Sequence, residues 1–344
     1  MVTPRCPYFG KCGGCSYQHL EYEAELRLKE TSLKELFQKE LGLPDEVFFP
    51  ITPSPEPYFY RSRLDLSFHR VRGETVLGFM GEGSRGLVPI DSCTIARPEI
   101  NDFLPQLKEL ARERLTAINY KSANLVVRTD QEGKVRWGGI GAKSLELPEA
   151  DYFWIEIEGK RIFYSLDTFF QANLGILPEF IQNLRAFLDF TPETHFFDLY
   201  AGVGLFWTVF SGEVGEVWAI EESESAVRVA EFNRRYHNFS QVFLKQGKIE
   251  DSLDEILLNL KGGRLAAVID PPRKGLTPVA LEKLSAAKTL SPLVYISCHP
   301  PDLIRDLKGF LKAGWRIDRV APFDFFPRTR HLEVMTRMFY DSPL

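Results

Sequence analysis

The chain has 344 residues, a formal net charge of −5 at pH 7, and hydrophobic and charged contents of 44% and 26%. This composition is typical of a globular protein, and the length favours two domains. No apolar run approaches the length of a membrane helix and no secretory signal is visible, so we expect a cytoplasmic protein. The negative net charge argues against indiscriminate binding to polyanions but leaves room for a local basic face.

Three of the five cysteines lie close together in CPYFGKCGGC near the N-terminus. Cys6, Cys12 and Cys15 follow the spacing Cys-x5-Cys-x2-Cys, and the two glycines between the last pair let both sulfurs reach one metal centre. A fourth ligand must come from the two remaining cysteines, and Cys93 is the only candidate other than Cys298. Four thiolates suit either a tetrahedral zinc site or an iron–sulfur cluster. The alternative, a set of unligated buried thiols, is disfavoured by this dense spacing.

A helix is expected within residues 20–42, where apolar residues recur at helical spacing and stop before Gly42 and Pro44. Residues 50–165 are expected to form mainly strands and turns. Here YFYRSRLDLSFHRVR interleaves aromatic side chains with four arginines, Arg61, Arg63, Arg70 and Arg72. Basic side chains neutralise phosphates and aromatic rings stack on unpaired bases, so the segment is a candidate RNA contact. A strand with one solvated, charged face explains it equally well.

From about residue 175, apolar strands alternate with amphipathic helices, the pattern of a parallel α/β sheet. THFFDLYAGVGLF predicts a strand, a glycine turn and a helix, and Gly202 and Gly204 let a ligand approach the backbone. Glu221 ends the next strand, where a carboxylate accepts hydrogen bonds from both ribose hydroxyls of an adenosine. Trp207 takes the third glycine position of a dinucleotide motif, which favours S-adenosylmethionine over a nicotinamide cofactor.

Two further apolar strands end at functional side chains, RLAAVID at Asp270 and VYISC at Cys298. The carboxyl ends of parallel strands form the ligand crevice of an open α/β sheet. We therefore expect Gly202, Glu221, Asp270 and Cys298 to face one crevice. A lone cysteine is more often a small buried apolar residue, but these neighbours outweigh that interpretation.

Together the motifs resemble the RNA uracil-C5 methyltransferases that use S-adenosylmethionine and make 5-methyluridine. The resemblance covers nearly the whole chain and rests on CPYFGKCGGCSYQH, TFFQAN, DLYAGVGLF, IDPPRKG, ISCHP and FPRTRHLEVM, in that order. It implies that Cys298 is the nucleophile, Glu333 the general base and Asp270 part of the catalytic crevice. It also implies a [4Fe-4S] cluster on Cys6, Cys12, Cys15 and Cys93, and cofactor contacts from Gln171, Tyr200, Gly202, Gly204, Glu221 and Asp270.

These residue types fit the chemistry. A thiolate that adds to C6 of uracil makes C5 nucleophilic, and a carboxylate then removes the C5 proton after methylation. The target base must first leave its stack. Without the resemblance, Glu333 would be interpreted as a surface acid on an exposed strand. Two residues depart from the usual motifs, since His299 and Leu205 stand where relatives often have asparagine.

The resemblance further implies an α/β fold with a Rossmann-like methyltransferase domain at 166–344 and a smaller, mainly-β iron–sulfur domain from 1–18 and 50–165. The helix within 19–49 is expected to pack on the methyltransferase domain. We expect no N-terminal oligonucleotide-binding barrel of the kind that some relatives carry, and the combination of a cluster and no barrel favours ribosomal RNA over transfer RNA as substrate. We expect a monomer. The alternatives are a catalytically silent RNA-binding protein and an iron–sulfur redox protein.

Overall fold

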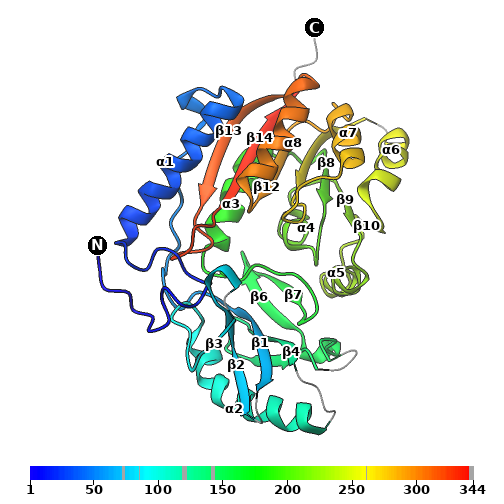
Figure 1. Ribbon diagram of the computed structural model, residues 1–344. Helices are drawn as coiled ribbons and strands as arrows, with labels where there is room; N and C mark the ends of the chain where they lie inside the picture. Colours follow the sequence, from blue (N-terminus) through cyan, green and yellow to red (C-terminus); the bar gives the residue numbers. More distant parts are fainter. Residues whose placement is uncertain (72–73, 85, 118–121, 141–143, 261, 341–344) are drawn as a thin grey trace.

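The computed structural model describes residues 1–71, 74–84, 86–117, 122–140, 144–260 and 262–340. Two large sheets form two parts of the molecule, and a two-stranded sheet lies between them (Figure 1). None of the helices in these ranges combines the length and apolar character needed to cross a membrane.

The smaller part is an antiparallel sheet of five strands in the order β3-β2-β1-β4-β5, with α2 (Pro98–Ala117) packed on it. Leu64, Leu66 and Phe68 alternate along β1 and point into the core with Leu104 and Leu107 of α2, as the two-residue period of a strand requires. The strands are β1 (Arg63–Val71), β2 (Glu74–Met80), β3 (Leu87–Pro89), β4 (Ser122–Thr129) and β5 (Val135–Gly138).

The larger part is a seven-stranded sheet in the order β10-β9-β8-β11-β12-β14-β13. The first five strands of this order are parallel, and β14 and β13 are antiparallel additions at one edge. The strands are β8 (Thr194–Leu199), β9 (Glu216–Glu221), β10 (Val242–Gln246), β11 (Arg264–Ile269), β12 (Leu293–Ser297), β13 (Arg316–Phe323) and β14 (Glu333–Phe339).

Helices cover both faces of this sheet. Phe196 and Phe197, neighbours on β8, lie in different hydrophobic cores because successive side chains of a strand point to opposite faces. One core contains α3 (Leu177–Leu188), α4 (Leu205–Phe210) and α5 (Glu224–Tyr236). The other contains α1 (Tyr22–Leu41), α6 (Ile249–Asn259), α7 (Pro278–Ala286) and α8 (Pro300–Lys312).

Helix α1 packs on the large sheet although it belongs in sequence to the N-terminal part. Its Leu33 and Phe37 are buried in the same core as Phe197 and Leu307, and the helix lies beside α8 (Figure 1). It ends at Leu41 because Gly42 takes a left-handed conformation, with a φ of 66°, and its N–H caps the Gln38 carbonyl.

The hairpin of β6 (Phe153–Ile157) and β7 (Lys160–Tyr164) packs differently from the expectation that 50–165 form one unit. Phe153, Ile155 and Ile162 are buried in the core that contains α3, α4 and α5, not in the core of the five-stranded sheet. Packing therefore assigns this hairpin to the larger part. Three short 3-10 turns complete the described elements, η1 (Asp45–Val47), η2 (Glu82–Ser84) and η3 (Glu149–Asp151).

Candidate active site

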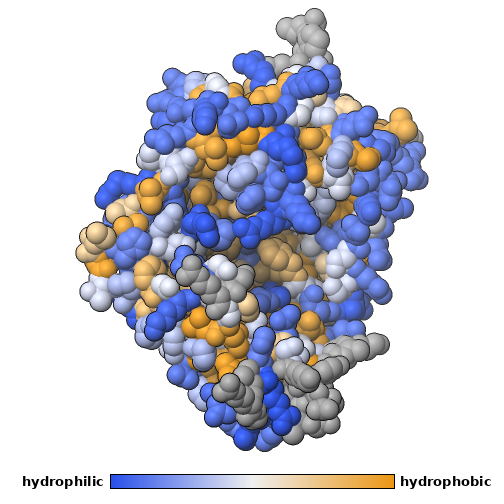
Figure 2. All heavy atoms as spheres, viewed as in Figure 1, coloured by the Kyte–Doolittle hydropathy of each residue, from blue (hydrophilic) through white to orange (hydrophobic). Residues whose placement is uncertain are grey.

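A cavity of about 820 Å³ opens at the carboxyl ends of the parallel strands. The view coloured by hydropathy shows apolar residues in the hollow between the two parts of the molecule and hydrophilic residues around it (Figure 2). The cavity brings together residues that the sequence spreads over more than 160 positions. Its lining includes the expected Gln171, Tyr200, Gly202, Glu221, Asp270, Cys298 and Glu333.

At one end of the cavity, the turn after β8 and the end of β9 are joined by a carboxylate. Glu221 accepts hydrogen bonds from the backbone N–H groups of Gly202 (2.9 Å) and Ser223 (2.7 Å). Gly202 has a φ of 56°, and a Cβ added there would meet no atom within 4 Å, so its free side faces open space. A ligand can therefore approach the backbone at Gly202, as the glycine pattern predicts.

Gly204 serves packing instead. A Cβ at Gly204 would lie 2.1 Å from the ring of Trp207, which is fully buried. Asp198, on β8, accepts a hydrogen bond from the backbone N–H of Trp207 (3.1 Å), and burial raises the Asp198 pKa well above its ordinary value. Trp207, which stands where a dinucleotide motif has its third glycine, thus packs against the glycine turn.

At the other end of the cavity, three chemically active side chains come from three adjacent strands. In the order β11-β12-β14, Asp270 follows β11, Cys298 follows β12 and Glu333 opens β14. Because β14 runs antiparallel to β12, its first residue lies at the edge where the parallel strands end. Glu333 is only 4% exposed, so it is not the surface acid that its sequence context alone would indicate.

The electrostatics of this cluster are unfavourable for negative charge. Burial, and then the charges of Glu333 and Asp270, raise the pKa of Cys298 to about 12, while the charge of Arg273 opposes them. Burial raises the pKa of Asp270 to about 7. Burial and then the charge of Asp270 raise the pKa of Glu333 well above its ordinary value. A cationic ligand in the cavity would favour ionisation of all three groups.

The two unusual residues of the motifs have distinct roles. His299 donates its backbone N–H to the Ser297 hydroxyl (3.1 Å), and its Nδ1 lies 2.6 Å from an Asp302 carboxylate oxygen, which ties it to the first turn of α8. Leu205 lines the cavity as a buried apolar side chain, so it offers packing where an asparagine would offer hydrogen bonds.

Several cavity residues were missed by the sequence analysis. Arg273, in DPPR, places a cation near Cys298. Phe169, in TFFQ, is 72% exposed although it lines the cavity. Arg273 lies in the motif IDPPRKG and Phe169 in TFFQAN. The motifs alone do not show that Arg273 lies near Cys298 or that the Phe169 ring is exposed at the cavity. Phe170, Phe206 and Phe326 add apolar walls.

Arg128 holds the segment that carries Phe169 and Gln171. This fully buried guanidinium, on β4, donates hydrogen bonds to the carbonyls of Ser165 (2.5 Å) and Thr168 (3.0 Å), and burial lowers its pKa to about 9. The contacts of Arg128 have no sequence signature, because their acceptors are backbone carbonyls about forty residues away.

The four expected metal ligands line a second, smaller cavity of about 140 Å³, together with Arg61. Burial raises the pKa of Cys12 and Cys93, and raises that of Cys15 to about 12, and neighbouring thiols add to each increase. Within the described ranges, no group of three or more His, Cys, Asp or Glu side chains is arranged to hold a metal ion. The structure thus gathers the thiols without establishing a metal centre or an iron–sulfur domain.

The candidate RNA-contacting arginines differ in their surroundings. Arg61 donates from Nε to the Arg63 carbonyl (2.9 Å). Arg63 pairs with Asp65 (2.8 Å) and reaches the Thr168 carbonyl (3.4 Å), so much of its hydrogen-bonding capacity is used within the protein. Arg70 is exposed on β1. Arg72 lies outside the described residues.

The open α/β sheet, its glycine turn and its acidic strand end define a Rossmann-like methyltransferase fold. The fold is similar to that of the Pyrococcus abyssi tRNA (uracil-54, C5)-methyltransferase, crystallised with S-adenosyl-L-homocysteine. That match has a TM-score of 0.72 and 22% identity, and covers 94% of this chain and 85% of the other.

Sequence comparison identifies the family. Residues 147–338 match the tRNA (Uracil-5-)-methyltransferase family. The chain is 27% identical to an uncharacterized RNA methyltransferase of Thermosynechococcus vestitus and 28% identical to another of Clostridium tetani, each over 97% of this chain and 83% of the relative. The chain therefore belongs to the tRNA (uracil-5-)-methyltransferase family and is an S-adenosylmethionine-dependent RNA methyltransferase.

Proposed function

We propose that this enzyme methylates C5 of a uridine in RNA through a covalent bond between Cys298 and C6 of the base, with Glu333 as the general base. The observation that carries the proposal is that Cys298, Asp270 and Glu333 line one cavity with Gly202 and Glu221. A nucleophile, a buried carboxylate and a cofactor-type glycine turn therefore share one cavity.

Cofactor binding is assigned to the Gly202 end of the cavity. Glu221 would accept hydrogen bonds from the ribose hydroxyls, in the way that a carboxylate at this strand end does in related sheets. Tyr200, Gln171 and Asp270 line the cavity and complete the proposed contacts, whereas Gly204, expected among them, packs against Trp207 instead. The Pyrococcus abyssi protein of similar fold was crystallised with S-adenosyl-L-homocysteine, which supports S-adenosylmethionine as the cofactor. S-adenosylmethionine supplies an electrophilic methyl group on a sulfonium.

The protein's own residues then account for the reaction steps. The Cys298 thiolate adds to C6, and the electron pair of the C5–C6 double bond moves towards O4, which makes C5 nucleophilic. Once C5 carries the methyl group, the Glu333 carboxylate takes the C5 proton. The electrons of that C–H bond restore the double bond as the C6–S bond breaks and releases the thiolate. The raised pKa of Glu333 makes its carboxylate a stronger base for this step.

RNA would enter past Phe169, whose exposed ring at the cavity suits stacking on an unpaired base. Arg61, Arg63, Arg70 and Arg72 are the proposed phosphate contacts. Ribosomal RNA and transfer RNA are the two candidate substrates, and the family description and the name of the Pyrococcus abyssi protein both specify transfer RNA.

A [4Fe-4S] cluster on Cys6, Cys12, Cys15 and Cys93 is part of the proposal. Support comes from the shared cavity that the four thiols line. Each of the four irons of such a cluster takes one thiolate, so the sulfurs need not converge on a single ion. Zinc is the alternative.

The test is methylation of purified ribosomal and transfer RNA with labelled S-adenosylmethionine, followed by digestion to nucleosides. We expect label in 5-methyluridine from one of the two RNA pools, and none with Cys298→Ala. Label in any other nucleoside would contradict the proposal. No label in either pool would favour a catalytically silent RNA-binding protein or a redox protein.

A further inference from the structure

The segment 324–332 joins β13 to β14 and leads directly into Glu333. Four successive carbonyls of this segment each accept a hydrogen bond from a distant part of the chain. The donors are Asn173 Nδ2 to Phe325 (3.2 Å), Lys29 Nζ to Phe326 (3.2 Å), Tyr60 OH to Pro327 (3.0 Å), and the N–H groups of Ser16 and Tyr17 to Arg328 (2.8 and 3.0 Å).

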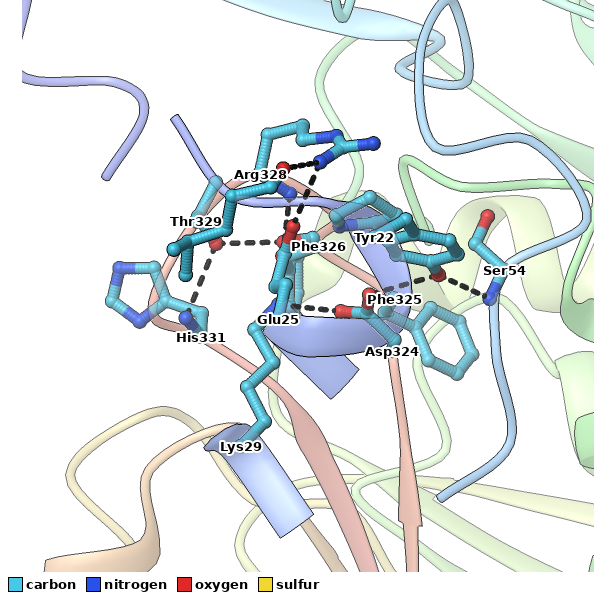
Figure 3. A network of polar contacts seen from close by, with 12 residues as sticks. Tyr22, Glu25, Lys29, Ser54, Asp324, Phe325, Phe326, Arg328, Thr329 and His331 are labelled. Carbon is cyan, nitrogen blue, oxygen red and sulfur yellow. Dashed lines mark hydrogen bonds and ion pairs between the residues drawn. The ribbon is translucent and has the colours of Figure 1, made fainter. Parts of the chain in front are cut away.

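A buried network of charged side chains contacts the same segment (Figure 3). Lys29 bonds to Glu25 (2.8 Å) and to Asp324 (2.7 Å), and all three side chains are buried. Tyr22, also on α1, donates to Asp324 (3.0 Å) and accepts from the Ser54 N–H (2.8 Å). One face of α1 therefore binds the start of the segment.

Arg328 is held in a strained backbone conformation at the centre of this network. Its φ of 68° lies in the left-handed region, which a side chain other than glycine rarely adopts. Glu25 accepts from its N–H (2.7 Å), while Ser16 and Tyr17 donate to its carbonyl. Such strain persists only where the surroundings impose it, and it concentrates at functional sites.

Buried ion pairs of this kind add little net stability, and their best-attested use is to specify one conformation. We propose that Tyr60, Lys29 and Glu25 are positioning residues that set the 324–332 segment so that Glu333 is aligned with the C5 proton. The inference rests on the proposed role of Glu333 as the general base. Cys298, in contrast, is carried by β12 and α8, so a displaced segment should slow proton removal more than thiol addition.

The cysteine segment takes part in this positioning. Ser16 and Tyr17 directly follow Cys15, and Tyr60 packs in a cluster with Ile95 that contacts Cys15 and Cys93. Ser16, Tyr17 and Tyr60 thus link the cysteine-lined cavity to the segment before Glu333.

Two neighbouring tyrosines provide a matched test. Tyr58 and Tyr60 are both buried in the same cluster, but only the Tyr60 hydroxyl donates to a described carbonyl of residues 325–328. Tyr60→Phe should lower kcat roughly 3- to 10-fold, the range expected for one lost hydrogen bond. KM for RNA and for S-adenosylmethionine should not change. The fraction of enzyme covalently bound to RNA on denaturing gels should rise, because addition continues while release slows.

Tyr58→Phe should change neither kcat nor the bound fraction. Hydrogen exchange of the 324–332 amides should be faster in Tyr60→Phe than in Tyr58→Phe, and thermal melting should show both variants folded. If Tyr60→Phe lowers kcat without raising the bound fraction, or behaves like Tyr58→Phe, the positioning role is wrong.

Glu333→Gln separates this inference from the function on which it rests. If Glu333→Gln accumulates the covalent complex and Tyr60→Phe does not, only the positioning role fails. If Glu333→Gln accumulates none, the base assignment fails and the positioning role fails with it.

Discussion

Asp270 and Glu333 lie in one cavity at the ends of the two strands that flank β12, and the charge of Asp270 raises the Glu333 pKa. Because burial also raises the pKa of Asp270 to about 7, both carboxyls keep protons in the folded chain at pH values where the unfolded chain has lost them. The folded protein is therefore more stable when the two carboxyls are protonated than when they are ionised.

This relationship predicts how stability depends on pH. A raised carboxyl pKa contributes stability that is present below the unfolded value of about 4 and is lost as pH rises through the folded value. Asp270→Asn removes one such group and lowers the Glu333 pKa, so its Tm should fall less than that of the wild type between about pH 5 and pH 8. Asp102→Asn, at an exposed position of α2, is the control. Equal declines in Tm for Asp270→Asn and wild type would contradict the prediction.

Removing the nucleophile should separate binding from chemistry. Cys298→Ala should bind S-adenosylmethionine as the wild type does, measured by calorimetry, because none of the proposed cofactor contacts uses the sulfur. It should form no 5-methyluridine, since C5 is not nucleophilic without addition at C6. Substantial methylation by this variant would overturn the mechanism.

Trapping should identify the base. Glu333→Gln keeps Cys298 and the shape of the side chain, so addition and methylation proceed while proton removal is impaired. A protein–RNA adduct should therefore survive denaturing electrophoresis. RNA with 5-fluorouridine should trap the wild type in the same way, because fluorine does not leave as a proton does. Absence of adduct in both experiments would leave the assignment of Glu333 without support.

Replacing Glu221 should weaken the cofactor specifically. Glu221→Gln would lose the proposed charge-assisted hydrogen bonds to the ribose and weaken the bonds from Gly202 and Ser223, so Kd for S-adenosylmethionine should rise roughly 10- to 100-fold. Glu224→Gln, at the exposed start of α5 and outside the cavity lining, is the matched control. A Kd that rises equally in both variants would mean that net charge, not the ribose contact, explains the change.

The proposed metal centre is tested by the elemental composition of the purified protein. We expect iron and labile sulfide in anaerobically purified protein, and their loss in Cys15→Ser. Cys298→Ser should retain both, because Cys298 lies in the other cavity. One zinc per chain, with no sulfide, would refute the cluster. Since Ser16 and Tyr17 bind the Arg328 carbonyl, loss of the cluster should also speed hydrogen exchange in 324–332.

The arginines are best separated one at a time. Arg70 is exposed, whereas Arg63 is already paired with Asp65, so Arg70→Ala tests a phosphate contact without disturbing an internal one. Affinity for RNA should fall, and the slope of log K against log salt should decrease by about one. Arg27→Ala, at an exposed position of α1, is the control. An unchanged slope for Arg70→Ala would assign Arg70 to the solvated face of its strand.

The sequence by itself determined the carboxyl edge of the large sheet. Apolar runs that stop at Asp270 and Cys298, and a glycine turn followed by Glu221, are local patterns, and parallel strands bring their ends to one edge whatever their order. Only the tertiary structure decided that Glu333 is buried, because that depends on β14 entering beside β12 in the opposite direction. The same holds for the contact of Tyr60 with Pro327, 267 residues away. A backbone carbonyl has no side-chain signature, so contacts of this kind become visible only when the chain is folded.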